Sequence, residues 1–176
     1  AQLQRAKARL HGKEGEGRYI AYFQSFTNTY APAEYLRPLF EAAMAPEEVV
    51  ALSVATRPDC LPPEILDLLA ELNRRKPVWV ELGLQTIHPE SAAYLRRGYE
   101  LPVFENGVRA LRARGIEVIV HLILGIPGET RENMVASARY AGQWADGVKL
   151  HLLHVLDGTD LAAEYAAGRV RPLERE

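Results

Sequence analysis

Apolar residues fall into two alternating patterns along the chain, short strand-like runs and longer segments with helical periodicity. The strand-like runs are rich in β-branched and aromatic residues and cover residues 18–26, 49–55, 78–84, 116–124 and 148–155. Apolar positions recur at helical spacing over residues 33–44, 63–75, 103–114 and 131–145. Strands that alternate with helices in this way predict parallel βαβ units.

Each predicted strand has one apolar face and one face with polar or ionisable groups. In VWVELGLQ, valine and leucine alternate with Trp79, Glu81, Gly83 and Gln85. The other strands place these residues on the second face: Ser53, Arg57, Glu117, His121, Ile123, Lys149 and His151. Helices cover both faces of a doubly wound sheet but only the outside of a barrel. The chain is therefore predicted to be an α/β protein, a partial parallel (βα) barrel of the TIM-barrel type whose polar interior encloses a cavity.

The composition indicates one well-packed globular domain. Of the 176 residues, 48% are apolar and 25% are charged, and the formal net charge is -2. No apolar run reaches the about 18 residues that cross a bilayer, and the first residues, AQLQRAKARL, lack a signal-peptide pattern. We therefore expect a cytoplasmic protein with no membrane partner. The near-neutral charge gives no basic footprint of the kind that nucleic-acid binders carry.

Metal-ligating residues are few in this sequence. Cys60 is the single cysteine, which excludes an internal disulfide and an all-cysteine metal site within the chain. His121, His151 and His154 have the side-chain chemistry of a zinc site, but they lack local ligand spacing, and His154 has the opposite strand parity to His151. We predict no metal site from the residues of this chain.

A polar or glycine-rich segment follows every predicted strand. FTNT follows the first strand, TRPD the second, QTIHPE the third, GIPGET the fourth and HVLDGT comes at the end of the fifth. Barrel enzymes place their sites at the carboxyl ends of the strands, so Thr27, Asn28 and Thr29 are expected at the rim. Helix capping is the alternative role for these three residues, since Pro32 begins the next helix.

Six segments, taken together and in this order, resemble one family. FQSFTNTYAP, SVATRPDCLP, VELGLQT, LRRGY, HLILGIPGET and KLHLLHVLDGT resemble the radical S-adenosylmethionine (radical SAM) superfamily. The nearest branch is the bacterial group similar to the elongator catalytic subunit, with oxygen-independent coproporphyrinogen oxidases and tRNA methylthiotransferases more distant. The resemblance covers residues 3 to 160, so we expect a barrel core over residues 1–160 and a tail helix or extension over residues 161–176.

The resemblance implies a six-stranded partial barrel, of which about five βα units are present here. Such proteins bind a 4Fe-4S cluster and S-adenosylmethionine, cleave the latter reductively, and use the 5'-deoxyadenosyl radical to abstract hydrogen. Their three cluster cysteines follow the first strand, whereas this sequence starts after that point, with AQLQRAKARL resembling the first helix. Cys60 matches no cluster position. We expect a fragment that is inactive alone.

The resemblance also implies partners for the full-length protein. These are an electron donor such as flavodoxin or ferredoxin and, by family analogy only, tRNA as a substrate. The missing first unit leaves a barrel edge unpaired, which favours a dimer through that edge.

The resemblance assigns cofactor contacts to the strand ends. Thr27, Asn28 and Thr29 stand where relatives hold the methionyl amino group, and an ammonium needs converging oxygen acceptors. Arg57 is predicted to clamp the cofactor carboxylate, or instead to form an ion pair with Asp59.

The nucleoside end of the cofactor is assigned to the third, fourth and fifth strand ends. Gln85 matches the ribose position, unless it is simply a polar residue that ends a strand. The adenine contacts are predicted at Ile123, Ile126 and Pro127 on one side and at His154 and Val155 on the other.

Two other classes of protein stay open at this point. A non-catalytic interaction module predicts a barrel interior filled by apolar side chains. A conventional barrel lyase or aldolase would use Lys149 as its nucleophile, with a lowered pKa. Glu81 and Lys149 are either a buried pair or substrate-binding groups, and the roles of His121 and His151 are open.

Overall fold

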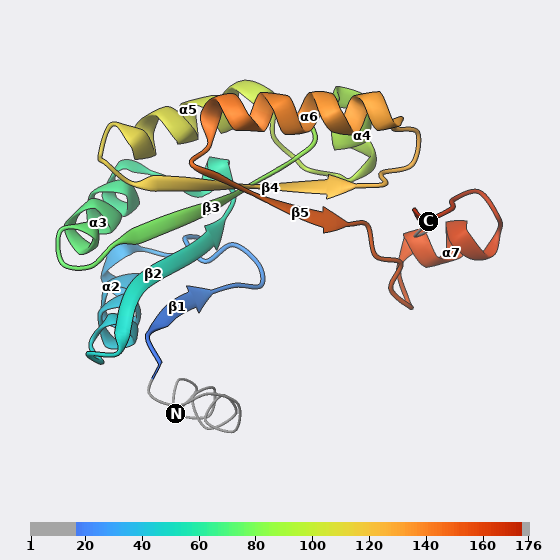
Figure 1. Ribbon diagram of the computed structural model, residues 1–176. Coiled ribbons are helices and arrows are strands. Elements are labelled where there is room, and N and C mark those ends of the chain that lie inside the picture. The colour runs from blue at the N-terminus through green and yellow to red at the C-terminus, as the bar shows by residue number, and fades with distance from the viewer. Residues whose placement is uncertain (1–16, 174–176) are drawn as a thin grey trace.

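The strands form one curled parallel sheet in which spatial order follows chain order. A computed structural model describes residues 17–173. Its sheet has the order β1-β2-β3-β4-β5, every pair being parallel (Figure 1). The strands are β1 (Tyr19–Phe23), β2 (Val49–Thr56), β3 (Val78–Gln85), β4 (Glu117–Leu124) and β5 (Gly147–Leu152). The predicted partial barrel is confirmed; the predicted first helix, AQLQRAKARL, lies outside the described residues.

Four helices cover the outer side of the sheet. They are α2 (Ala33–Met44), α3 (Pro63–Asn73), α5 (Leu101–Arg112) and α6 (Arg131–Trp144), and Figure 1 shows them along one side of the curled strands. Three short elements complete the described chain: η1 (Pro58–Cys60), α4 (Pro89–Tyr94) and α7 (Asp160–Ala166). No helix within residues 17–173 has both the length and the apolar character needed to cross a membrane.

The core lies between the sheet and these outer helices. The predicted apolar faces of the central strands are fully buried there, with helix residues packed against them, as in Leu52, Val80, Leu82, Val118, Val120, Phe40, Leu69 and Phe104. Full burial of such a side chain contributes about 1.5–3 kcal/mol relative to exposure. The alternation read from the sequence therefore places the polar face on the concave side of the sheet.

The outer face of β5 departs from this pattern. Val148, Leu150 and Leu152 were expected on a buried apolar face, yet 39%, 58% and 45% of their surfaces are exposed. The reason is position, because β5 is the last strand of the described sheet and α6 is shared between it and β4.

Several element ends differ from the sequence prediction. The first strand was expected to reach residue 26, but it ends at Phe23, since Ser25 and Phe26 have positive φ angles of 59° and 64°. The fifth strand ends at Leu152 rather than at residue 155, and the short α4 was not predicted. These corrections all fall at the carboxyl-terminal rim.

Candidate functional site

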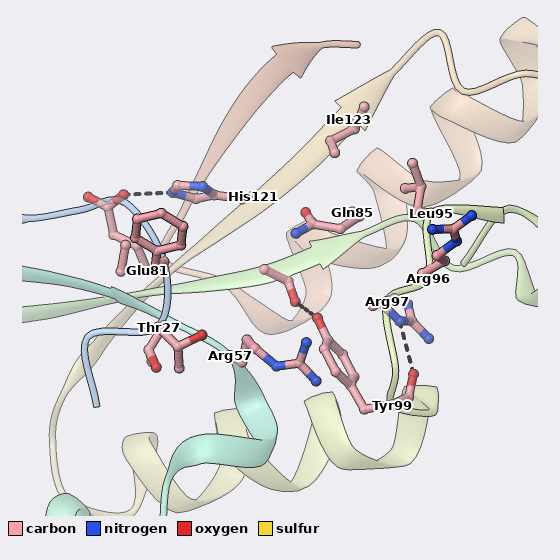
Figure 2. Close-up of a pocket in the computed structure, with 14 residues that line it drawn as sticks. Thr27, Arg57, Glu81, Gln85, Leu95, Arg96, Arg97, Tyr99, His121 and Ile123 are labelled. Carbon is pink, nitrogen blue, oxygen red and sulfur yellow. Dashed lines mark hydrogen bonds and ion pairs between the residues drawn. The ribbon is translucent and has the colours of Figure 1, made fainter. Parts of the chain in front are cut away.

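A cavity of about 390 Å³ opens at the carboxyl ends of β1 to β4 (Figure 2). Its volume lies in the range of roughly 300–1,000 Å³ that is typical of small-molecule sites. The cavity is lined by Phe26, Thr27, Ala55, Thr56, Arg57, Glu81, Gly83, Gln85, Leu95, Arg96, Arg97, Tyr99, His121 and Ile123. Four of the residues predicted to bind the cofactor therefore share one cavity: Thr27, Arg57, Gln85 and Ile123.

Gln85 faces this cavity because the end of β3 is irregular. The residue has a positive φ of 67°, and the pairing of β3 with β4 shifts between Gly83 and Gln85. The side chain folds back over Gly83, where an added Cβ would lie 2.6 Å from Nε2 of Gln85. Glycine at position 83 thus provides the space in which the amide of Gln85 lies.

Arg57 is held in the ion pair that was the alternative to a cofactor contact. Its Nε and Nη2 donate to the two carboxylate oxygens of Asp59 at 2.9 and 2.7 Å. This bond lowers the pKa of Asp59. The guanidinium also lies over the ring of Tyr99, 5.2 Å from its centroid, so Arg57 is fixed at the cavity wall with the Nε and Nη2 edge of its fork in use.

Arg97 is a cavity residue that the sequence reasoning did not single out, although it lies in the quoted segment LRRGY. It is 8% exposed, and its partners within residues 17–173 are backbone carbonyl oxygens. Nη1 donates to the carbonyls of Leu84 and Thr86, and Nε donates to that of Tyr99. A buried charge without a counter-ion is unfavourable. The cavity wall therefore carries a positive charge that an anionic ligand would balance.

The polar triplet after β1 serves mostly to build the rim. The Asn28 amide donates to the carbonyls of Phe23 and Ala55 at 3.1 and 2.9 Å and so joins the ends of β1 and β2. Thr29 is 2% exposed, and its hydroxyl contacts the Thr56 hydroxyl and the Cys60 carbonyl. Thr27 alone of the three lines the cavity. Helix capping by these side chains is not observed, since α2 has no side-chain cap.

The predicted adenine contacts are divided in space. Ile123 lines the main cavity, while Ile126 is 1% exposed and lies in the turn between Gly125 and Gly128, both with positive φ. His154 and Val155 line a second cavity, of about 550 Å³, between the end of β5 and α7. Pro127 lines neither of these two cavities. The structure thus does not bring His154 and Val155 into the cavity of Gln85.

A buried carboxylate lies at the inner end of the main cavity. Glu81 is 3% exposed and accepts bonds from Tyr22, Ser53, His121 and Lys149. Burial alone would raise the pKa of Glu81, but these bonds, that of Lys149 foremost, lower it from 4.5 to about 2. Burial lowers the pKa of His121, against the opposing effect of Glu81. Within residues 17–173, no three His, Cys, Asp or Glu side chains are arranged to hold a metal ion.

The sheet is curled and parallel, and it has a polar cavity at the carboxyl ends of its strands. These features are typical of a partial-barrel domain that binds a small molecule. Residues 3–141 match the family described as the Radical SAM superfamily. The chain belongs to this family.

Relatives of known sequence align with this chain over a quarter to about half of their own length. YtqA of Bacillus subtilis is 46% identical over 171 residues, which are 97% of this chain and 53% of the relative. A tRNA uridine(34) acetyltransferase of Methanocaldococcus jannaschii is 28% identical over 136 residues, 75% of this chain and 25% of the relative. The chain spans about half the length of YtqA.

A solved structure supports the fold. Elp3 of Methanocaldococcus infernus with an N-terminal deletion aligns with a TM-score of 0.79 at 21% identity, over 97% of this chain and 45% of that chain. The five-stranded half-barrel is thus shared with a larger protein.

Proposed function

We propose that this chain is the S-adenosylmethionine-binding core of a radical SAM enzyme. The observation that carries the proposal is that the guanidinium of Arg97, which has no ion-pair partner within residues 17–173 and lies over the Tyr99 ring, lines the same cavity as Gln85 (Figure 2). S-Adenosylmethionine has a carboxylate that matches the charge of Arg97 and ribose hydroxyls that both donate to and accept from an amide. Bound in a complete enzyme, it supplies the carbon radical of the reaction.

The remaining contacts follow from the cavity lining. Arg97 takes the carboxylate in preference to Arg57, because Asp59 already occupies the fork of Arg57. Ile123 supplies apolar contact to the base, and Thr27 offers an oxygen to the amino group. Asn28 and Thr29 would contact the cofactor through backbone groups, because their side chains bond within the rim. His154 and Val155 would contact the adenine only if the second cavity lay nearer to the cofactor. Ile126 and Pro127 are proposed as adenine contacts through their backbone groups.

The residues of this chain do not fit a 4Fe-4S cluster. Cys60 is its one cysteine, and burial raises the pKa of its thiol, whereas cluster ligands are thiolates. We therefore propose that reductive cleavage belongs to the longer protein, served by an electron donor such as flavodoxin or ferredoxin, and that the 176-residue chain is inactive alone. A tRNA substrate is supported by the likeness to a tRNA uridine(34) acetyltransferase.

Two alternative functions are less well supported by the interior of the sheet. An interaction module should have an apolar interior, but Glu81, His121 and Lys149 occupy it. A Schiff-base lysine attacks as a free amine, whereas the Lys149 ammonium is bonded to both oxygens of Glu81 at 2.7 and 2.6 Å.

Calorimetric titration with S-adenosylhomocysteine tests the proposal, because this analogue keeps the carboxylate, amino group, ribose and adenine. We expect saturable binding that weakens about threefold to tenfold in Gln85→Ala, the loss of one or two neutral hydrogen bonds. Arg97→Lys should weaken binding further, since an ammonium lacks the fork of the guanidinium.

Arg112→Lys is the matched control, because Arg112 pairs with Asp146 and does not line the cavity. Its affinity should equal that of the wild type. Absence of binding by the wild type, or equal affinities in all variants, would contradict the proposal.

A further inference from the structure

Glu81 accepts hydrogen bonds from one side chain on each of the four remaining strands of the described sheet. Glu81 stands on β3, and its donors are Tyr22 on β1, Ser53 on β2, His121 on β4 and Lys149 on β5. The distances from these donors to the carboxylate oxygens are 2.9, 2.5, 2.6 and 2.6 Å in that order. All four donors converge on one carboxylate.

Glu81 is saturated by these bonds. An ionised carboxylate has about four acceptor sites, and here Oε1 accepts from Ser53 and Lys149 while Oε2 accepts from Tyr22, His121 and Lys149. The carboxylate therefore has no acceptor capacity left for a ligand. What it does is hold Lys149 and His121 in place on the concave face.

Lys149 and His121, the two groups that Glu81 positions, keep hydrogen-bonding atoms that Glu81 does not contact. The Lys149 side chain is 41% exposed; its ammonium donates to both oxygens of Glu81 and lies 4.4 Å from the centroid of the Tyr22 ring. His121 donates through Nε2, because its partner accepts only, and this leaves Nδ1 free of Glu81. The exposed ring of His151 lies 4.8 Å from that of His121, centroid to centroid.

The cluster contains one group that can carry a negative charge and three groups that can carry a positive charge. One carboxylate, Glu81, bonds to Lys149 and His121, and the ring of His151 lies against that of His121. Tyr22 from β1 contributes a neutral hydroxyl, and Ser53 from β2 is not ionisable. Glu117, on the same side of β4, lies four residues before His121, about 13 Å along the strand. The charges of Glu81 and Lys149 balance each other, so a bound anion would be matched by a proton taken up on an imidazole of the cluster.

A purely structural pair is a poor explanation for this arrangement. Buried ion pairs are often no more stabilising than apolar residues of similar volume, so the core does not require Glu81 and Lys149. Figure 2 shows Glu81 and His121 on the wall of the same cavity as Gln85. Glu81 lies four residues before Gln85 on β3, about 13 Å deeper along the strand.

We propose that Lys149, His121 and His151 form a recognition subsite for an oxyanion, a carboxylate or phosphate group, of the substrate. The inference rests on the proposed function, since it places the substrate next to the cofactor on the concave face. His121 and Glu81 line the cavity of Gln85, and Lys149, which lies beyond that lining, bonds to Glu81. Lys149 supplies a positive charge, His151 offers a ring nitrogen, and His121 takes up a proton as the anion binds. Glu81 is the positioning residue that orients Lys149 and His121.

The test is a titration of the 176-residue chain, labelled with ¹⁵N in its histidine rings, with two probes. Sulfate represents the tetrahedral oxyanion and acetate the carboxylate, and neither changes charge between about pH 6 and about pH 8, on either side of the histidine range. We expect saturable shifts of the His121 and His151 resonances with at least one probe. Binding should be tighter at the lower pH, because burial lowers the pKa of His121 and proton uptake by this ring accompanies anion binding.

Variants and an internal control separate the subsite from non-specific ion effects. Lys149→Met should weaken probe binding about tenfold or more, while Lys149→Arg should retain it. If Lys149→Met does not fold, His151→Gln tests the same subsite, because His151 is exposed and makes no bond to Glu81. His88, whose ring contacts the Asn133 carbonyl, is the internal control and should not shift.

The result also separates this inference from the cofactor proposal. Binding of S-adenosylhomocysteine without any probe-dependent shift of His121 and His151 would overturn the subsite alone. Shifts of His88 equal to those of His121, or equal probe affinities in wild type and Lys149→Met, would overturn it as well. Probe binding without S-adenosylhomocysteine binding would instead contradict the cofactor proposal.

Discussion

At the scale of single residues, side-chain direction at the rim depends on backbone features that the sequence shows only indirectly. Gln85 was predicted as a ribose contact from the family resemblance, and alternation placed it on the polar face of its strand; it does line the cavity. Arg97 was not predicted, since its burial arises from carbonyls of residues 84, 86 and 99 that meet only in the folded chain. Likewise, nothing local indicates that Asn28 would join two strands.

The pair formed by Gly83 and Gln85 gives a prediction about ligand affinity. In Gly83→Ala, the new methyl group would lie 2.6 Å from Nε2 of Gln85 and would displace that flexible side chain. We expect S-adenosylhomocysteine to bind about as weakly as to Gln85→Ala, with little change in melting temperature. The double variant should bind no more weakly than either single variant, as calorimetry would show; additive losses would argue against this coupling.

At the scale of elements, strands and long helices followed from periodicity, whereas their ends did not. The four long helices and five strands match the predicted segments, but α4 has only six residues, too few for a periodic signal. The early end of β1 results from two positive φ angles at non-glycine residues, for which the sequence has no marker. The exposed outer face of β5 depends on what packs beside it, which alternation alone does not specify.

The start of α6 gives a stability prediction for one element. Thr130 accepts from the Asn133 backbone N–H, and the Asn133 side chain accepts from the Thr130 backbone N–H, a complete capping box. Thr130→Ala should lower the free energy of unfolding by about 1 kcal/mol, measured by urea denaturation. Thr130→Ser is the matched control and should be close to wild type; an equal loss in both variants would rule out the cap as the cause.

At the scale of the whole molecule, the concave face links all five strands of the described sheet through one carboxylate. The polar interior and the barrel were predicted from alternation, and a pair of Glu81 with Lys149 was one of two alternatives for these residues, but the convergence of Tyr22, Ser53 and His121 on the same carboxylate was not predicted. Such convergence depends on the register and curl of the sheet, which set which inward residues meet.

This link predicts how the stability of the whole chain depends on pH. Because the pKa of Glu81 is lowered from 4.5 to about 2 in the folded chain, its stabilising effect is fully present above about pH 5. The effect is lost as the pH falls from there through about 2, where the folded-state carboxylate takes up its proton. The free energy of unfolding, measured in urea across this range, should therefore fall more steeply in wild type than in Glu81→Gln.

An identical pH dependence in the two proteins would show that Glu81 is not the responsible group. Ser53→Ala is a useful companion variant, because it removes one neutral donor and leaves Lys149 in place. Its pH dependence should lie between those of wild type and Glu81→Gln.

The exposed outer face of β5 has a consequence for motion. A strand with few buried apolar contacts belongs to the least stable part of a structure and opens locally before the core does. Lys149 lies on this strand, so each such opening withdraws the ammonium from Glu81 while β2, β3 and β4 stay intact. Amide hydrogens of β5 should accordingly exchange faster than those of β3, and a bound oxyanion, by holding Lys149, would slow their exchange.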